Sequence, residues 1–200
     1  MKFFLVLFMC TLCVTQISYA QCTKADIVIL VDYSGSISGN ESAVKKALVA
    51  SAGIFDGASD MRVSIVTFSD NFEVVVPFTA NLVLYSHQVN RLEVVSDNST
   101  RMADAIDFAQ LYFAQLSRPG TRKVVILVSD GKPNSPSLAN TTVTNAKKDD
   151  ILFFSIYISS DYGYSEAKRF MLSVASEAHY FFQSSYSDLG QLLQDLDPCM

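Results

Sequence analysis

The strongest constraint on the fold is a set of continuous apolar runs. Residues 27–31 read IVILV, residues 124–128 read VVILV and residues 151–158 read ILFFSIYI. Strands with one solvated face alternate apolar and polar residues, whereas unbroken apolar strands are buried on both faces, as in a parallel sheet covered by helices. Weaker strand patterns occur at 63–68 (VSIVTF) and 178–182 (AHYFF). These runs predict the strands of an α/β sheet.

Helical periodicity fills the segments between these strands. Residues 41–55 and 101–116 repeat apolar residues at helical spacing, and further helices are expected near 81–94, 138–148, 165–175 and 187–196. Stripes of this kind are explained by packing against a sheet. The residues that share a face are Val44, Ala47, Leu48 and Ile54 in the first segment, and Met102, Ala105, Ile106, Ala109, Phe113 and Leu116 in the second.

One connection is too short for a parallel crossover. Residues 63–68 and 72–78 (FEVVVPF) are separated by Ser69, Asp70 and Asn71 alone. A parallel crossover needs about a dozen residues, so this pair is expected to be an antiparallel hairpin. Pro77 has no backbone N–H to donate and suits an edge strand. The sequence therefore predicts an α/β fold with a doubly wound, mostly parallel six-stranded sheet, one antiparallel edge strand and helices on both faces.

The first twenty residues have the composition of a secretory signal peptide. Lys2 supplies a positive start, residues 3–14 (FFLVLFMCTLCV) supply an apolar region, and Ser18 and Ala20 are small residues at the cleavage positions. A membrane anchor is the alternative, but the run is shorter than the roughly 20 residues needed to span a bilayer. We predict a signal peptide over 1–20 and a secreted, extracellular single domain over 21–200.

The charge balance argues against nucleic acid as a partner. The formal charge is −5, and removing Lys2 with the signal peptide makes it −6. Proteins that bind nucleic acid present a basic face to the phosphates. After the predicted signal peptide, the sequence contains no apolar run long enough to span a membrane.

Two further features fit an extracellular compartment. Cys22 and Cys199 remain after the signal peptide is removed. In an oxidising compartment such a pair most simply forms a disulfide, and two free thiols are the alternative. In the chain-entropy model, a disulfide between residues this far apart would stabilise the folded state by about 5 kcal/mol. Glycosylation sequons begin at Asn40, Asn98 and Asn140, although such triplets also arise by chance.

Polar residues follow two of the apolar strands. Asp32 ends the first run in VILVDYSGSIS (28–38), where Ser34 and Ser36 follow it, and Asp130 ends the second in VSDGKP. Ligands of open α/β sheets bind beyond the carboxyl ends of the strands. If the two strands are neighbours, their carboxylates converge. Thr100, just before the helix expected near 102, adds a third hydroxyl at the same edge.

Each of these residues also has an ordinary structural explanation. Asp32 and the two serines could be turn residues or helix caps, and Thr100 could be an N-cap. Asp130 followed by Gly131 is a common turn pair. Two acids and three hydroxyls at one sheet edge are harder to explain in this way than any one of them alone.

The combination favours a site for a hard divalent cation. Mg²⁺, Mn²⁺ and Ca²⁺ prefer oxygen ligands, whereas zinc and copper prefer His and Cys clusters. His87 and His179 are isolated in the sequence and are expected on the surface or in packing. Neutral hydroxyl ligands leave the cation enough positive charge to take an anionic oxygen from outside.

The pattern resembles the metal-ion-dependent adhesion site (MIDAS) of the von Willebrand factor type A family. The matching features are DYSGS after an apolar strand, a threonine before a helix, and SDG after a second apolar strand. VSIVTFSD and the final YSDLGQLL helix extend the resemblance over nearly all of residues 24–199. The resemblance implies a secreted adhesion module that holds Mg²⁺, or else Mn²⁺ or Ca²⁺, and binds an Asp or Glu of an extracellular protein.

The resemblance also implies a role for each site residue. The two serines would be direct ligands, and Thr100 would bind either directly or through water. Asp32 and Asp130 would hold the cation largely through waters, with Asp130 able to bind it directly in another state. Residues 96–100 (SDNST) replace the glycine that the family usually has before the threonine, so Ser99 is an alternative to Thr100.

Two other classes of function fit the sequence less well. A serine hydrolase needs a Gly-x-Ser-x-Gly elbow, and Ser34 has no glycine two residues before it. An aspartyl phosphotransferase would need a second acid where Ser34 stands, and neither Gly35 nor Gly39 precedes a lysine as a phosphate loop requires. Enzymatic activity is therefore not expected. A metal-independent interaction scaffold of the same fold remains an alternative, which chelation of the cation would distinguish.

Overall fold

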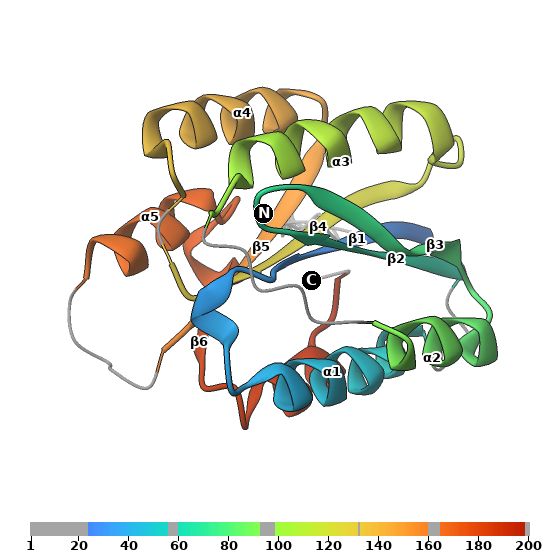
Figure 1. Cartoon of the computed structure of the whole chain (residues 1–200). Helices are drawn as coiled ribbons and strands as arrows, with labels where there is room; N and C mark the ends of the chain where they lie inside the picture. The colour runs from blue at the N-terminus through green and yellow to red at the C-terminus, as the bar shows by residue number, and fades with distance from the viewer. Residues whose placement is uncertain (1–23, 56–59, 93–98, 132, 160–164, 199–200) are drawn as a thin grey trace, which may run out of the picture.

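Six strands form one sheet in the order β3-β2-β1-β4-β5-β6 (Figure 1). The computed structural model describes residues 24–55, 60–92, 99–131, 133–159 and 165–198. The predicted signal peptide, Cys22, Cys199 and Asn98 fall outside these residues. The strands are β1 (Lys24–Asp32), β2 (Asp60–Phe68), β3 (Phe72–Thr79), β4 (Arg122–Ser129), β5 (Ile151–Ile158) and β6 (Phe181–Ser184).

The pairing of the strands confirms the predicted sheet. β1 pairs in parallel with both β2 and β4, and β5 pairs in parallel with β4 and β6. β3 pairs with β2 and is antiparallel to it, as the short connection at Ser69–Asn71 requires. β3 is also an edge strand, so Pro77 stands where a missing N–H is tolerated.

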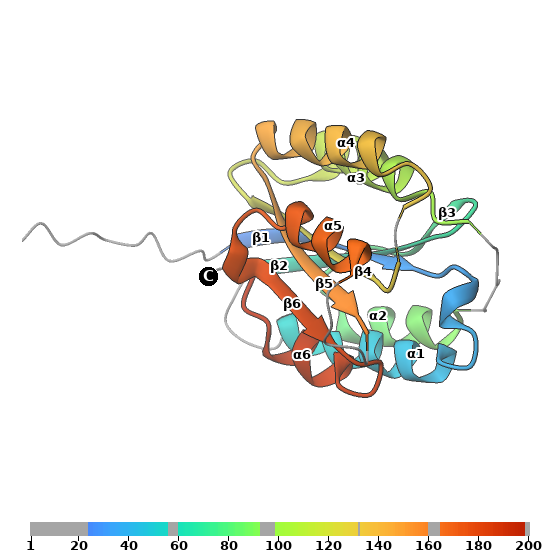
Figure 2. The ribbon, with the colours of Figure 1, turned by 90° about the vertical axis from the view of Figure 1, so that its left-hand side faces the viewer.

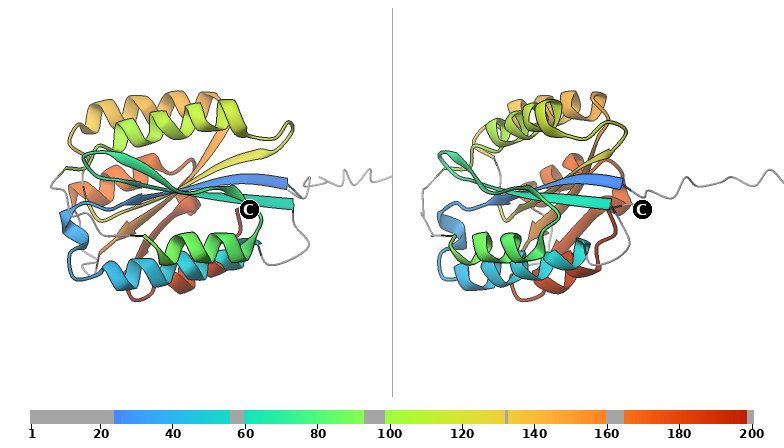
Figure 3. Two further views of the ribbon diagram at one scale, coloured as in Figure 1. Left: turned by 45° about the vertical axis from the view of Figure 1, so that its right-hand side comes forward. Right: turned by 90° about the vertical axis from the view of Figure 1, so that its right-hand side faces the viewer.

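Helices cover both faces of the sheet (Figure 3). One face carries the first, second and last helices, and the other carries the three between them. No helix in the described part of the chain is long and apolar enough to cross a membrane. The helices are α1 (Glu41–Ala50), α2 (Leu82–Asn90), α3 (Met102–Leu116), α4 (Pro136–Lys148), α5 (Glu166–Val174) and α6 (Leu189–Asp195).

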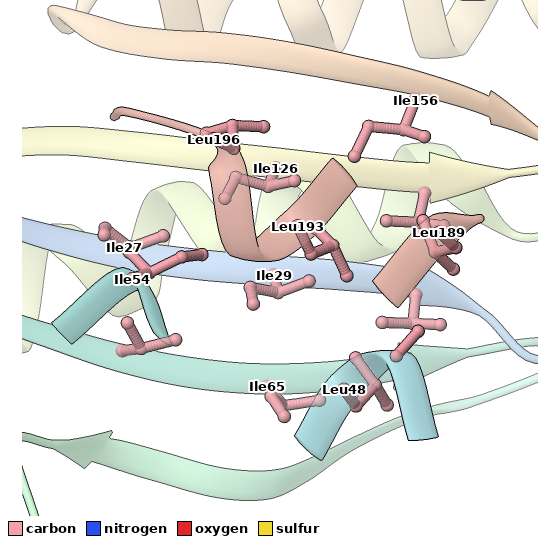
Figure 4. Close-up of a cluster of buried hydrophobic side chains, with 14 of the residues drawn as sticks. Ile27, Ile29, Leu48, Ile54, Ile65, Ile126, Ile156, Leu189, Leu193 and Leu196 are labelled. Atoms are coloured by element: carbon pink, nitrogen blue, oxygen red, sulfur yellow. The ribbon is translucent and has the colours of Figure 1, made fainter. Parts of the chain in front are cut away.

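The two faces of β1 explain its unbroken apolar run. Ile27 and Ile29 point into the core under α1 and α6, where they lie among Leu48, Leu193 and other labelled side chains (Figure 4). Val28 and Leu30 point into the opposite core, beneath α3 and α4. All four β1 side chains are fully buried. Alternate residues of a strand face opposite sides, so the middle of a strand covered on both faces is apolar without a break.

Three sequence-based expectations need correction. The strand expected at 178–182 begins at Phe181, because Ala178–Tyr180 forms a 3-10 turn. The helix expected over 41–55 ends at Ala50 and continues as a 3-10 turn, where the Ser51 hydroxyl donates to the Leu48 carbonyl at 2.7 Å. Leu116 is expected in the core but is 50% exposed, and it is the last residue of α3.

A buried ion-pair network ties the sheet together near the amino ends of its strands. The carboxylate of Asp26 is fully buried and accepts from the guanidinium of Arg62 at 2.7 and 2.9 Å. It also accepts from the backbone N–H and the Nε of Arg118 at 2.8 and 3.0 Å. The network therefore joins β1, β2 and the connection between α3 and β4.

The network predicts a specific loss of stability in acid. Burial by itself raises the pKa of Asp26, but the hydrogen bonds from Arg62 and Arg118 outweigh it and hold the pKa below its ordinary value of 3.8. A carboxyl with a lowered folded pKa contributes stability above the unfolded pKa and loses it as the pH falls through the folded pKa. The difference in unfolding free energy between wild type and Asp26→Asn should therefore shrink below about pH 4. Urea denaturation at a series of pH values measures this, and a difference that stays constant down to pH 2 would contradict it.

Candidate metal centre

The two acids predicted to meet do stand on neighbouring strands. Asp32 is the last residue of β1, and Asp130 directly follows β4. β1 and β4 pair in parallel as far as Val31 and Val128. The strand order reverses here, since β2 and β3 lie on one side of β1 while β4 to β6 lie on the other. This reversal point, at the carboxyl ends of the strands (Figure 2), is where open α/β sheets bind ligands.

Asp32 is buried and held by hydrogen bonds at the end of β1. It is 3% exposed, and its two carboxylate oxygens accept from the Ser129 hydroxyl at 2.6 Å and from the Ser34 backbone N–H at 3.1 Å. The pKa of Asp32 is raised, mainly because the carboxyl is buried and to a smaller extent because Asp130 is also negatively charged. The hydrogen bonds from Ser129 and Ser34 lower this pKa and so offset part of the rise. Ser34, itself 5% exposed, follows as the first polar residue of the loop.

Asp130 is oriented by a tyrosine from a distant part of the chain. The Tyr186 hydroxyl, in the loop between β6 and α6, donates to a carboxylate oxygen of Asp130 at 2.8 Å. Burial and this hydrogen bond both raise the pKa of Tyr186, so the phenol keeps its proton. The Ser129 hydroxyl accepts from the backbone N–H of Gly131 at 3.2 Å and so links the Asp130 turn to Asp32.

Thr100 lies on an adjoining loop of the same edge. Its N–H donates to the side-chain oxygen of Asn134, and its carbonyl accepts from the Asn134 N–H, both at 3.1 Å. The next residue, Arg101, donates its N–H to the Ser69 carbonyl at 3.0 Å. Thr100 therefore stands between the β2–β3 hairpin and the loop after β4. Ser99 also contacts Asn134, whose side-chain amide donates to its hydroxyl at 2.5 Å.

The structure thus brings Asp32, Ser34 and Asp130 to one edge and places Thr100 beside them. Ser36 lies in the 3-10 turn Gly35–Ile37, and its side chain is outside the described part of the structure. Three residues that orient this set were not identified from the sequence: Ser129, Asn134 and Tyr186. Ser129 and Tyr186 lie inside the quoted motifs SDG and YSDLGQLL, but neither motif indicates which side chain it contacts.

The chemistry of the edge fits a hard cation. Among the described residues, no group of three or more His, Cys, Asp or Glu side chains gathers at one place, so a cation at this edge would have to be held by two carboxylates together with hydroxyls. His87 and His179 are exposed, as expected. Two carboxylates repel each other here beside a buried serine, so a divalent cation would offset that repulsion and accept their oxygens.

Tyr186→Phe should weaken this centre without unfolding it. The substitution removes the hydroxyl that fixes the Asp130 carboxylate, and partners of metal-holding side chains are typically worth 10–100-fold in metal affinity. We expect the affinity for Mg²⁺, measured by calorimetry, to fall about tenfold or more. Tyr112→Phe is the matched control, because the Tyr112 hydroxyl contacts the Phe78 N–H at the far side of α3. Equal Mg²⁺ affinity in the Tyr186→Phe variant and wild type would show that the tyrosine does not position Asp130.

Sequence comparisons agree with this architecture. The family model described as von Willebrand factor type A domain matches residues 26–195. The collagen alpha-1(VI) chain of Mus musculus is 28% identical over 121 residues, which are 54% of this chain and 12% of that one. Integrin alpha-2 of Mus musculus is 29% identical over 143 residues, 66% of this chain and 12% of the integrin. The chain therefore spans a small part of the length of these relatives.

Solved structures share the fold at lower identity. A structure of proximal thread matrix protein 1 from the mussel byssus superposes with a TM-score of 0.74 and 20% identity, over 87% of this chain and 47% of that chain. A second structure of the mussel protein, with a zinc-occupied MIDAS motif, gives a TM-score of 0.72 and 22% identity over the same shares. At 20% and 22% sequence identity, this structural similarity establishes the fold alone.

Proposed function

The chain belongs to the von Willebrand factor type A domain family, and from that premise we propose that it is an extracellular adhesion module that binds its partner through a divalent cation. The observation that supports the proposal is that Asp32 and Asp130 both lie at the reversal point of the sheet, with the hydroxyl of Ser129, the last residue of β4, donating to Asp32. In the part of the chain that the structure describes, hydroxyls and no His or Cys side chains contact these acids, which favours Mg²⁺, with Mn²⁺ or Ca²⁺ as alternatives.

Each residue of the centre has a part in this proposal. Ser34, Ser36 and Thr100 would hold the cation through their hydroxyls, with Ser99 as the alternative to Thr100. Asp32 and Asp130 would hold it largely through water, because both carboxylates already accept hydrogen bonds from neighbouring hydroxyls. The bound cation would supply a positive charge that attracts a carboxylate. The hydrogen bonds to Asp32 and the Tyr186 contact would keep the carboxylate oxygens in place before the partner arrives.

The proposed partner is an extracellular protein that presents an Asp or Glu. The collagen VI and integrin relatives are matrix and cell-surface proteins, which supports an extracellular location. We propose that residues 1–20 are removed as a signal peptide, that residues 21–200 form the single domain, and that Cys22 and Cys199 form a disulfide. Catalysis is not part of the proposal.

Binding to an extracellular matrix extract tests this function. Purified protein should be retained on the extract in Mg²⁺ and released when EDTA removes the cation. Ser34→Ala should lose retention, because it removes a proposed ligand at a buried position. Ser137→Ala, at an exposed position of α4, is the matched control and should be retained as wild type is. Retention that survives EDTA would instead identify a metal-independent scaffold.

A further inference from the structure

A hollow lies directly beside the candidate metal centre. It has a volume of about 540 Å³, and Asp130 forms part of its wall. The rest of the wall comes from the end of β5, from the loop between β6 and α6, and from Asn40 before α1. Its volume falls within the range of about 300–1,000 Å³ that is usual for small-molecule sites. A group attached to a carboxylate at the metal would extend into this space.

The wall of the hollow is rich in hydroxyls. Asp130 is the one charged side chain among the described residues that line it, and Ile158 is the one aliphatic side chain. A hydroxyl can both donate and accept a hydrogen bond, so this wall suits a ligand that carries several hydroxyls of its own. A second anionic group would meet no positive side chain among these lining residues. The remaining lining residues are Asn40, Tyr157, Ser159, Ser185, Tyr186 and Ser187.

Several of these hydroxyls are fixed before any ligand binds. The Ser185 hydroxyl donates to a carboxylate oxygen of Asp188 at 2.8 Å and lies 2.7 Å from the Ser187 hydroxyl. Tyr186 donates its only hydroxyl proton to Asp130, so its oxygen can accept from a ligand hydroxyl. Fixed polar groups lower the ordering cost of binding. The ring of Tyr186, which is partly exposed, adds apolar surface for the face of a ring-shaped ligand.

We propose that this hollow is a sugar subsite, and that the metal face, besides an Asp or Glu of a protein, also binds an acidic sugar of an extracellular glycan. The inference rests on the proposed function, since the sugar carboxylate would bind at the cation while the ring hydroxyls bind in the hollow. A uronic acid has one carboxylate and several hydroxyls on adjacent carbons, which matches one cation beside a hydroxyl-lined wall. A peptide that presents Asp or Glu would use the cation without needing the hollow.

The test uses an oligosaccharide that contains glucuronic acid, and the same oligosaccharide with its carboxylates reduced to alcohols. Calorimetry with unglycosylated protein in Mg²⁺ should detect binding of the acidic form, loss of that binding in EDTA, and at least tenfold weaker binding of the reduced form. Ser187→Trp adds bulk at an exposed wall position and should weaken binding of the acidic form at least tenfold while leaving Mg²⁺ affinity unchanged. Gln115→Trp, exposed near the end of α3, is the control and should bind within twofold of wild type.

Other outcomes separate the sugar subsite from the proposed function. Metal-dependent binding of a glutamate-containing peptide without binding of the acidic oligosaccharide would overturn the sugar subsite and leave the adhesion function standing. Absence of Mg²⁺ binding would overturn both. Asn40→Ala removes a polar wall group at the turn before α1 and should weaken oligosaccharide binding several-fold. Wild-type oligosaccharide affinity in both the Asn40→Ala and Ser187→Trp variants would show that the hollow is not the site.

Discussion

Asp130→Ala is expected to abolish Mg²⁺-dependent partner binding while the protein stays folded. Asp130 follows β4 at the carboxyl edge, and its side chain faces Tyr186 rather than either core. Loss of the hydrogen bond from Tyr186 to this carboxylate costs about 1.5–3 kcal/mol, the range for a hydrogen bond to a charged group. Removing one of two neighbouring acids also relieves the repulsion that raises the pKa of Asp32. These two effects on folding stability oppose each other, so the protein should stay folded. Nothing offsets the effect on Mg²⁺ binding, because the variant lacks one of the two carboxylates proposed to hold the cation.

Calorimetry with Mg²⁺ and retention on the matrix extract measure this effect. Asp70→Ala is the matched control, because Asp70 is an exposed acid in the β2–β3 hairpin at the same edge. The control should keep both Mg²⁺ affinity and retention. Wild-type Mg²⁺ affinity in the Asp130→Ala variant would remove Asp130 from the site.

Asp26→Ala is expected to give the largest loss of stability among single acid substitutions in the described part of the chain. It leaves Arg62 and Arg118 without the buried carboxylate that both contact. Breaking a buried ion pair from one side typically costs about 3–5 kcal/mol. The two arginine side chains are 24% and 22% exposed, so water can partly replace the lost partner. We therefore expect a loss of about 3 kcal/mol, at the lower end of that range.

Chemical denaturation of wild type and Asp26→Ala tests the contribution of the network. In a thermal melt of the same proteins, a loss of about 3 kcal/mol in unfolding free energy would lower the melting temperature by about 10 °C in a domain of this size. Asp60→Ala is the matched control, since Asp60 pairs with Arg118 and Lys24 but its side chain is 60% exposed. Exposed ion pairs contribute about 0–1 kcal/mol, so Asp60→Ala should change the unfolding free energy little. A similar loss in both variants would show that burial of Asp26 is not what makes the network important.

The sheet could be predicted from the sequence because its signals are local. Every residue of the run at 27–31 enters one of two cores, as expected for a strand that is covered on both faces. The hairpin at Ser69–Asn71 could be predicted because a connection of this length is too short for a parallel crossover. Leu116 was misplaced because helical spacing gives the face of a residue but not where α3 ends relative to the sheet.

The candidate site was predictable in its acids and not in the side chains that orient them. Asp32 and Asp130 could be brought together because parallel strands end at one edge and ligands bind there. The hydrogen bond from Tyr186 to Asp130 joins residues that are 56 positions apart in the sequence. The hydrogen bond between Asn134 and Thr100 joins residues that are 34 positions apart. Such contacts depend on how separate loops fold over the edge, which spacing in the sequence does not encode. The Cys22–Cys199 bond and occupancy of the sequons at Asn40, Asn98 and Asn140 stay predictions.

The position of the bound cation tests the central claim most directly. Asp26 and Asp32 are six residues apart on β1, so the network and the metal edge are separated by about 20 Å. Paramagnetic Mn²⁺ added to ¹⁵N-labelled protein should first broaden the amide resonances of Ser34, Thr100 and Gly131. The amides of Asp26 and Arg118 should stay sharp, and Asp130→Ala should remove the effect. Broadening centred elsewhere, or unchanged in the Asp130→Ala variant, would contradict a functional cation at the β1–β4 edge.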